Sequence, residues 1–275
     1  MTVLMNSETL QVSQDISYTL YSKNDDYKAV VFYLHGGGLI YGSKSDIPRE
    51  LVNIFLNKDI AICCLDYLLA PNSGLDDILD VLFSTFDQLY SKYIISKDLD
   101  YYLMGRSAGS YLMFLLAKHL IDQESYKNPS KIINFYGFYN LELFNKTNTL
   151  SKQAITPEMI KNIDTASMIA DDPRLTRFLL YLYLQQNNKM LEALKVKDPS
   201  STKYSIEQSE FKKFPAIFSV ASITDKEVPM NYSKSLKNIV SGSKFIQLYY
   251  LEHDFLKDTS DSQVKQVFTQ LDEWL

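Results

Sequence analysis

Six short apolar runs, rich in β-branched and aromatic residues, limit what this chain can fold into. They occupy residues 29–34, 60–66, 100–104, 131–136, 216–221 and 244–251. Continuous apolar runs of this length are typical of strands buried on both faces of a parallel sheet. Segments with helical periodicity alternate with them, at about 45–57, 75–92, 108–121, 229–240 and 260–274. The alternation predicts an α/β fold with a mostly parallel central sheet and helices on both faces, and residues 16–21 add a strand in an antiparallel N-terminal portion.

One interval, residues 138–210, breaks this alternation because it contains no convincing strand pattern. Helical patterns occupy residues 157–170, 175–186 and 189–197 of the interval. A segment this long needs structure of its own within a compact domain. We therefore predict a core made of residues 1–137 and 211–275, with a helical cap insertion over 138–210.

Composition and charge exclude several classes of function. The formal net charge is −5, and acidic and basic residues are mixed, whereas a nucleic-acid-binding face needs clustered Lys and Arg. The apolar run at 111–117 is far shorter than the roughly 20 residues of a membrane span. The amino-terminal residues lack the basic and apolar regions of a signal peptide. These observations predict a cytoplasmic protein with no nucleic-acid partner and no membrane span.

The two cysteines, Cys63 and Cys64, are adjacent within an apolar run. Neighbouring side chains of a strand point to opposite faces of the sheet, so a disulfide between these two would be strained. We expect both to be buried thiols in a reducing compartment.

The segment Gly105–Gly109, which reads GRSAG, is the first candidate for chemistry. It follows a predicted strand and opens a predicted helix, as the G-x-S-x-G turn of a serine nucleophile requires. Ser107 could also be an ordinary helix N-cap, a role that serine fills well. The strand–turn–helix context favours Ser107 as the nucleophile.

A serine nucleophile needs a base, and the chain has three histidines to supply it. His119 follows Ser107 by twelve residues on the same predicted helix, roughly 18 Å along its axis and out of reach. His35 precedes three glycines and belongs to another element. His253 lies in the loop after the last predicted strand, where catalytic side chains of open α/β sheets gather. We therefore predict that His253 is the base.

Asp225 is the predicted acid that orients the imidazole of His253. It lies just beyond the strand at 216–221, and the order Ser107, Asp225, His253 is that of an α/β-hydrolase triad. Glu227 and Asp254 are alternatives. Glu227 lies two residues further into the loop, and Asp254 adjoins the histidine and is expected to point away from its ring.

The run His35-Gly36-Gly37-Gly38 follows another predicted strand. Glycines allow the main chain to approach a substrate, and backbone N–H donors to an oxyanion are each worth about 3 kcal/mol of barrier. A phosphate-binding loop would need a different glycine spacing, which is absent here. A plain glycine turn is the remaining alternative, but it would not account for three glycines beside a histidine.

Together these motifs resemble the hormone-sensitive-lipase-like branch of α/β-hydrolase esterases. Residues 35–43 (HGGGLIYGS), 66–71 (DYLLAP) and 105–109 (GRSAG) are close to the family patterns HGGGFxxGS, DYRLAP and GDSAG. The resemblance implies the α/β-hydrolase fold, a helical cap near the acyl pocket and hydrolysis of short to medium acyl esters. It also implies an oxyanion hole formed by the N–H groups of Gly37, Gly38 and Ala108, with His35 and Gly36 as structural parts of the motif.

The chain departs from the family patterns at five positions, which are Leu39, Leu68, Asn72, Arg106 and Ser110. These departures remove no catalytic group, but they leave the substrate preference open. Arg106 replaces an acid beside the nucleophile. It could attract an anionic acyl group, although such a residue more often pairs with a nearby acid.

These residues predict a serine carboxylesterase that acts through an acyl-enzyme on Ser107 and needs no metal or organic cofactor. The expected partner is a small-molecule ester, and a homodimer is compatible with the sequence. Two alternatives are a small peptidase or acylaminoacyl-type amide hydrolase and a ligand-binding protein on a hydrolase scaffold. The first lacks a clear recognition site for a peptide amino terminus, and the second would be expected to have lost the base or the acid.

Aromatic residues of the insertion are candidates to face the substrate, although each more often packs a cap against the core. The candidates are Phe138, Tyr139, Phe144, Phe178, Tyr181 and Tyr183.

Overall fold

A computed structural model describes residues 6–13, 15–145 and 150–275. Its centre is an eight-stranded sheet with the order β1-β2-β4-β3-β5-β6-β7-β8. The strands are β1 (Asn6–Gln11), β2 (Ser17–Ser22), β3 (Ala29–Leu34), β4 (Ile60–Leu65), β5 (Asp100–Arg106), β6 (Lys131–Phe135), β7 (Ile217–Ser222) and β8 (Lys244–Leu248). β1 and β2 are antiparallel to their neighbours, and β3 to β8 are all parallel, so the predicted sheet is confirmed.

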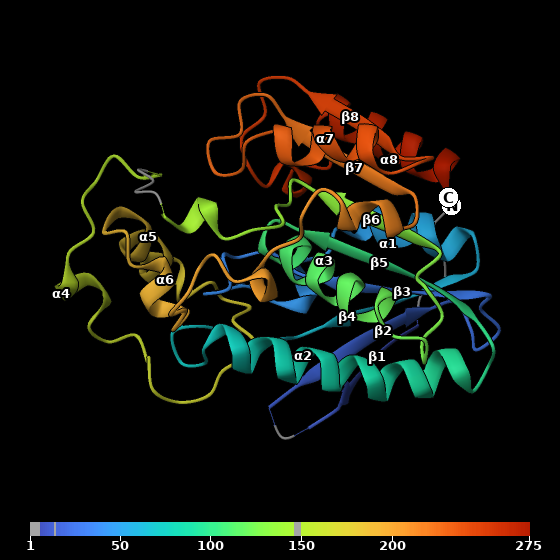
Figure 1. The fold of residues 1–275 in the computed structure, drawn as a ribbon, viewed down its shortest axis with the longest axis horizontal. Coiled ribbons are helices and arrows are strands. Elements are labelled where there is room, and N and C mark those ends of the chain that lie inside the picture. The colour runs from blue at the N-terminus through green and yellow to red at the C-terminus, as the bar shows by residue number, and fades with distance from the viewer. Residues whose placement is uncertain (1–5, 14, 146–149) are drawn as a thin grey trace.

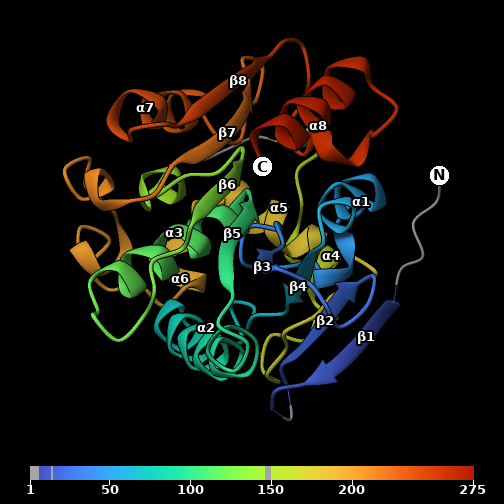
Figure 2. The same cartoon turned by 90° about the vertical axis from the view of Figure 1, so that its right-hand side faces the viewer.

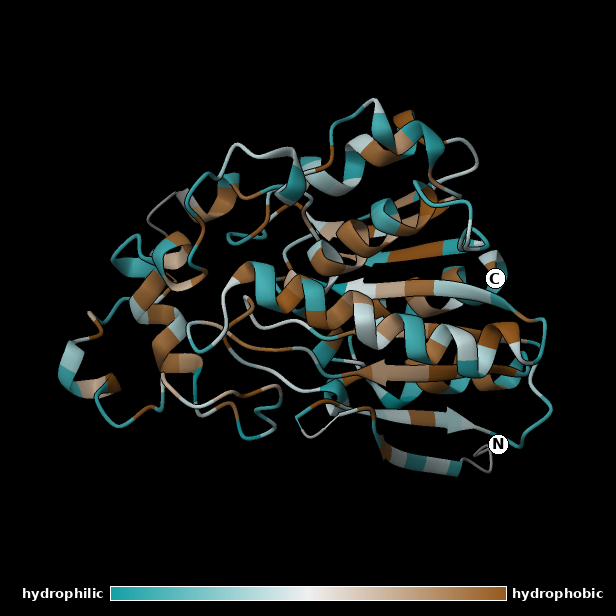
Figure 3. Ribbon diagram, turned by 60° about the horizontal axis from the view of Figure 1, so that its bottom comes forward, coloured by the Kyte–Doolittle hydropathy of each residue, from teal (hydrophilic) through white to brown (hydrophobic). Residues whose placement is uncertain are grey.

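Helices cover both faces of this sheet, as predicted (Figures 1 and 2). One face carries α1 (Arg49–Asn57) and α8 (Ser262–Trp274), and the other carries α2 (Leu75–Leu89), α3 (Ala108–Ile121) and α7 (Asn231–Ile239). Figure 3 shows the apolar colour concentrated on the central strands, with polar residues on the outer helix surfaces. Because apolar side chains fill both faces, β3 and β4 are buried along their whole length.

Two adjacent thiols illustrate this double-sided burial. Cys63 packs in the core layer that contains α2 and α3, and Cys64 packs in the layer that contains α1 and α8. Both are free and buried, as the sequence predicted. Burial raises the pKa of each thiol, which keeps them protonated and unreactive.

The parallel register brings the loops after four strands to one edge of the sheet. β3 pairs with β4 and β5 so that Ala29 lies opposite both Ile60 and Asp100. The residues that follow β3, β5, β7 and β8 therefore meet at the carboxyl end of the strands, where open α/β sheets bind ligands.

The helices of the segment 138–210 lie beyond this edge (Figure 1), but the described part of the segment is less helical than predicted. Its helices are α4 (Pro157–Ile160), α5 (Phe178–Gln186) and α6 (Met190–Ala193), joined by irregular chain and 3₁₀ turns. The helix predicted at 157–170 ends early because the Asp164 carboxylate accepts hydrogen bonds from the N–H groups of Ala166 and Ser167. The helix predicted at 175–186 begins only at Phe178, after Leu175 in a left-handed conformation.

Smaller differences concern element boundaries and one missing strand. The helix predicted at 75–92 changes at Tyr90 into a π-helical turn, Tyr90–Ile95. The strand β1 was not predicted, because its side chains are almost all exposed and carry no apolar pattern.

Candidate active site

Ser107 stands at the sharp turn between β5 and α3. Its φ and ψ of 50° and −123° are unusual for a residue other than glycine, and they project the hydroxyl away from the sheet. The turn is fixed by a hydrogen bond of 3.0 Å from the Ser107 N–H to the carbonyl of Phe135. The predicted strand–turn–helix context of this serine is therefore present.

Gly109 makes this turn sterically feasible. A Cβ added there would lie 2.2 Å from the carbonyl oxygens of Leu34 and His35. Helix α3 consequently crosses β3 at a distance that only glycine allows. This close crossing brings the Ser107 turn next to the loop that follows β3.

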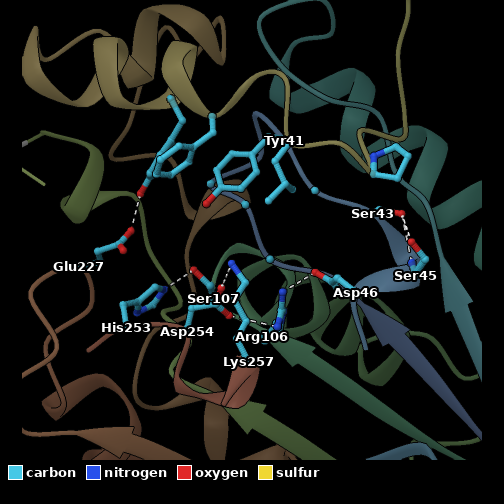
Figure 4. A pocket seen from close by; sticks show the side chains of 18 residues that line it. Tyr41, Ser43, Ser45, Asp46, Arg106, Ser107, Glu227, His253, Asp254 and Lys257 are labelled. Carbon is cyan, nitrogen blue, oxygen red and sulfur yellow. Dashed lines mark hydrogen bonds and ion pairs between the residues drawn. The ribbon is translucent and has the colours of Figure 1, made fainter. Parts of the chain in front are cut away.

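His253 lies next to Ser107 (Figure 4) and bridges it to Asp225. Its Nε2 is 2.8 Å from Ser107 Oγ, and its Nδ1 is 2.7 Å from Asp225 Oδ2. The other oxygen of Asp225 accepts hydrogen bonds from the N–H groups of Glu227 and Val228, at 2.8 and 2.9 Å. The carboxylate, whose side chain is fully buried, is thus held in one orientation toward the imidazole.

The two alternative acids make other contacts. Glu227 accepts a hydrogen bond of 2.8 Å from the hydroxyl of Tyr181. Asp254 turns away from the imidazole and pairs with Arg106 and Lys257. Of the three acids considered, the structure brings only Asp225 into hydrogen-bond contact with His253.

The other histidines are occupied elsewhere. His119 stacks on Phe83 with ring centroids 4.2 Å apart, remote from the Ser107 turn. His35 is completely buried, stacks on Tyr67 and contacts the carbonyl of Gly36 through Nδ1. Burial lowers the pKa of His35, so it is a neutral support for the glycine loop.

The glycine loop presents free backbone donors near Ser107. Gly37 and Gly38 have φ values of 113° and 62°, a conformation that favours glycine. Within the described ranges, the N–H groups of Gly37, Gly38 and Ala108 have no hydrogen-bond acceptor. Ala108 is the first residue of α3, where N–H groups are left unpaired by the helix itself. Such donors suit an anionic oxygen.

The electrostatic environment of His253 favours its protonated form. Burial alone would lower its pKa, but the hydrogen bond to Asp225 and the negative charges of Glu227 and Asp254 outweigh burial and raise it. A base that gains a proton readily is what general-base catalysis requires, provided that the imidazole is neutral at the working pH.

Arg106 pairs with acids rather than offering a free charge. Its guanidinium lies 2.5 Å from Asp46 and 3.1 Å from Asp254, and its side chain is only 5% exposed. Asp46 and Asp254 are in turn hydrogen-bonded by the hydroxyls of Tyr33 and Tyr136. Asp46 was not singled out from the sequence, although a buried arginine beside Ser107 implies an acidic partner.

Arg177 was also missed in the sequence. Its buried guanidinium donates to the carbonyls of Ile40 and Ala70 and to the side chain of Asn72. An arginine from the insertion thus contacts the segment that departs from the family pattern. That pattern, DYRLAP, has an arginine where this chain has Leu68, and the absence of that arginine was the available signal.

The aromatic candidates differ in whether they line a cavity at Ser107. Phe178 and Tyr181 line a cavity of about 430 Å³ whose walls include Ser107 and His253. Phe138 and Phe144, again with Tyr181, line a second, much smaller cavity beside Ser107. Tyr139 packs on Phe211 and Tyr232, and Tyr183 lines neither cavity.

Comparison with known proteins agrees with this geometry. A family model described as the alpha/beta hydrolase fold matches residues 31–196. The chain belongs to this alpha/beta hydrolase family. The match is consistent with the resemblance to the hormone-sensitive-lipase-like branch.

Two solved structures resemble this alpha/beta hydrolase along nearly its whole length. An alpha/beta hydrolase superfamily protein from Enterococcus faecalis is 40% identical, with a TM-score of 0.90 over 99% of this chain and 98% of the other. A protein of unknown function from Staphylococcus aureus subsp. aureus Mu50 is 27% identical, with a TM-score of 0.84 over 98% and 97%.

Among curated proteins, an acetyl esterase of Salmonella typhi is 28% identical over 145 residues. The aligned part is 50% of this chain and 45% of that esterase. The chain therefore spans about half the length of the curated relatives that it matches. Across the part of the chain that the structure describes, no helix is long and apolar enough to cross a membrane.

Proposed function

We propose that this protein is a serine carboxylesterase that cleaves short to medium acyl esters through an acyl-enzyme on Ser107. The observation that carries the proposal is the continuous hydrogen-bonded chain from Ser107 Oγ through His253 to Asp225. The name of the related acetyl esterase supports the same chemistry.

The proposed mechanism begins with His253. Its Nε2 removes the Ser107 proton while Oγ attacks the ester carbonyl, and Asp225 stabilises the imidazolium that forms. The developing oxyanion is bound by the N–H groups of Gly37, Gly38 and Ala108.

The second half of the reaction reverses these proton movements. His253 gives its proton to the leaving alcohol, which departs and leaves the acyl group on Ser107. His253 then takes a proton from water, whose oxygen attacks the acyl-enzyme. The imidazolium returns that proton to Ser107 Oγ as the bond between Oγ and the acyl carbon breaks, which releases the acid and restores the free serine. These steps need no metal or organic cofactor.

The test is the Ser107→Ala variant. We expect its hydrolysis of p-nitrophenyl acetate and butyrate to fall on the order of 10⁶-fold, because the nucleophile is removed. Ser91→Ala, an exposed serine outside the site, is the matched control and should retain full activity. Unchanged turnover by a folded Ser107→Ala variant would contradict the proposal.

Assays of the same purified protein distinguish the esterase from two alternative functions. An amide hydrolase would also cleave peptide or other amide substrates, which the proposed esterase should leave intact. A ligand-binding protein would fail to react with a fluorophosphonate probe.

The expected compartment is the cytoplasm, which suits the free thiols of Cys63 and Cys64. A homodimer also stays a prediction, which light scattering in solution would test.

A further inference from the structure

Two cavities of very different size meet at Ser107. The larger has a volume of about 430 Å³ and the smaller about 20 Å³, and both include Gly38 and Ser107 in their walls. Tyr181 and Glu227 also border both, joined by their 2.8 Å hydrogen bond. A Cβ at Gly38 would lie 2.3 Å from the Tyr181 ring, so this ring packs directly on the glycine loop. The Tyr181–Glu227 pair therefore forms a partition between the cavities.

The smaller cavity can take only a very small acyl group. Its other walls are formed by the apolar side chains of Phe138, Leu143, Phe144 and Val228 and by the amide of Gln185. Phe138 is fixed by edge contact with Phe144 and by stacking on Tyr111. A space of about 20 Å³ holds little more than one water-sized group, which matches the methyl of an acetyl ester.

The larger cavity is the one that must take the alcohol. His253 lines this cavity and not the smaller one. The base that takes the serine proton also protonates the leaving oxygen, so the leaving group must lie within its hydrogen-bond reach. An ester bound across Ser107 thus places its acyl group in the smaller cavity and its alcohol in the larger.

One wall of the larger cavity is a row of alternating charges (Figure 4). Asp46, Arg106, Asp254 and Lys257 follow one another, and each cation is paired with a carboxylate. No single charge dominates this wall, so it does not select a charged ligand. It offers donors and acceptors side by side, and a hydroxyl can use both because it donates and accepts. Apolar side chains that also line this cavity, including Leu175 and Phe178, suit the C–H face of a sugar ring.

Tyr41 adds an uncommitted hydroxyl to the same cavity. Figure 4 shows it directed toward Ser107, and among the described residues it has no hydrogen-bond partner. Its ring packs edge-on against Phe178, with ring centroids 5.4 Å apart, and at a tilt against Tyr181, with ring centroids 5.5 Å apart. The hydroxyl is therefore positioned by packing and left free to bind a ligand.

We propose that the substrate is an acetyl ester of a hydroxyl-rich alcohol, such as a sugar or polyol, and that the Tyr41 hydroxyl binds a hydroxyl of that alcohol. The proposal rests on the esterase function proposed above and narrows it. Tyr41 acts here as a specificity-determining residue, because the reacting ester group is common to all acetyl esters.

The first test compares 6-O-acetylglucose with cyclohexylmethyl acetate. Both are primary acetates on a six-membered ring, and they differ in the ring oxygen and hydroxyls. We expect kcat/KM to be at least about tenfold higher for the sugar ester, because a polar site left unpaired by an apolar analogue discriminates strongly. Equal values, or a preference for the cyclohexyl ester, would overturn the proposal.

The Tyr41→Phe variant tests the residue. We expect kcat/KM for 6-O-acetylglucose to fall about tenfold, as for the loss of one neutral hydrogen bond, with cyclohexylmethyl acetate changed less than about twofold. Tyr183→Phe, on α5 but outside both cavities, is the matched control and should leave kcat/KM for both esters unchanged. Equal losses on both esters in Tyr41→Phe would contradict the role in binding the alcohol.

The second test concerns the acyl side. We expect p-nitrophenyl acetate to be cleaved at least about tenfold faster than the hexanoate, since the smaller cavity cannot hold a longer chain. Leu143→Ala and Tyr181→Ala, which enlarge that cavity by different walls, should raise the relative rate on the butyrate. Equal rates on acetate and hexanoate in the unmodified protein would overturn this proposal alone, whereas no cleavage of any ester would refute the esterase function itself.

Discussion

Arg106, which precedes Ser107, connects the turn of that serine to the loop of His253, because its guanidinium lies 3.1 Å from the carboxylate of Asp254, the residue that follows His253. The same guanidinium reaches Asp46 in the segment that follows the glycine loop. One buried cation thus joins three segments that carry the proposed catalytic groups.

Replacing Arg106 by Gln should destabilise the protein. The substitution leaves Asp46 and Asp254 without their cation, and removing one partner of a buried pair typically costs about 3 kcal/mol. Urea unfolding would measure this loss. Lys257→Gln, which removes a mostly exposed cation from the same Asp254, should cost less than about 1 kcal/mol.

The same Arg106→Gln variant separates pairing from anion recognition. Because the guanidinium is engaged by two carboxylates, we expect the ratio of kcat/KM for neutral and acidic acyl esters to stay unchanged. A selective loss of activity on acidic esters would instead indicate that Arg106 binds the substrate.

Replacing Asp225 by Asn should preserve the fold and abolish most activity. Two backbone N–H groups hold one oxygen of this side chain, so the amide NH₂ of Asn would face His253 Nδ1. That nitrogen would then have to accept a hydrogen bond, which places the proton on Nε2 and prevents it from receiving the serine proton. The expected loss in kcat is about 10⁴-fold.

Asp254→Asn is the comparison for Asp225→Asn, because both acids lie close to His253 in the sequence. Asp254 contacts Arg106 rather than the imidazole. The fold-loss in kcat of Asp254→Asn should therefore be at least about a hundredfold smaller than that of Asp225→Asn. Comparable losses in the two variants would contradict the assignment of Asp225 as the orienting acid.

The activity should depend on pH through His253. The imidazole accepts the serine proton only when neutral, and its pKa is raised above the ordinary value of 6.5 by Asp225, Glu227 and Asp254 against the opposing effect of burial. We therefore expect kcat/KM to fall as the pH is lowered, with a midpoint above 6.5. A midpoint at or below this value would contradict the inferred environment.

Glu227→Gln should move that midpoint down toward the ordinary histidine value. The substitution removes a negative charge that favours the imidazolium, while the Gln oxygen can still accept from the Tyr181 hydroxyl. Glu252→Gln, an exposed acid next to His253 in the chain, is the matched control and should leave the midpoint unchanged.

The sequence by itself determined the parallel strands of the sheet and pointed to Ser107 and His253 at the site. Apolar runs of strand length appear at nearly the residues where β3 to β8 form, because strands buried on both faces must be continuously apolar. Ser107 was specified by the glycines that its turn needs, and His253 by the positions of the only other histidines. Such signals are local, so a single sequence carries them.

Only the tertiary structure decided which acid meets His253 and how large each cavity is. Asp225, Glu227 and Asp254 are similar in the sequence, and the hydrogen bonds of their loops direct them to different partners. The strand β1 and the early end of α4 escaped prediction because one is exposed and the other is ended by the Asp164 side chain. The direction of the Tyr41 hydroxyl and the Tyr181–Glu227 partition depend on contacts between segments far apart in the chain, which no local pattern records.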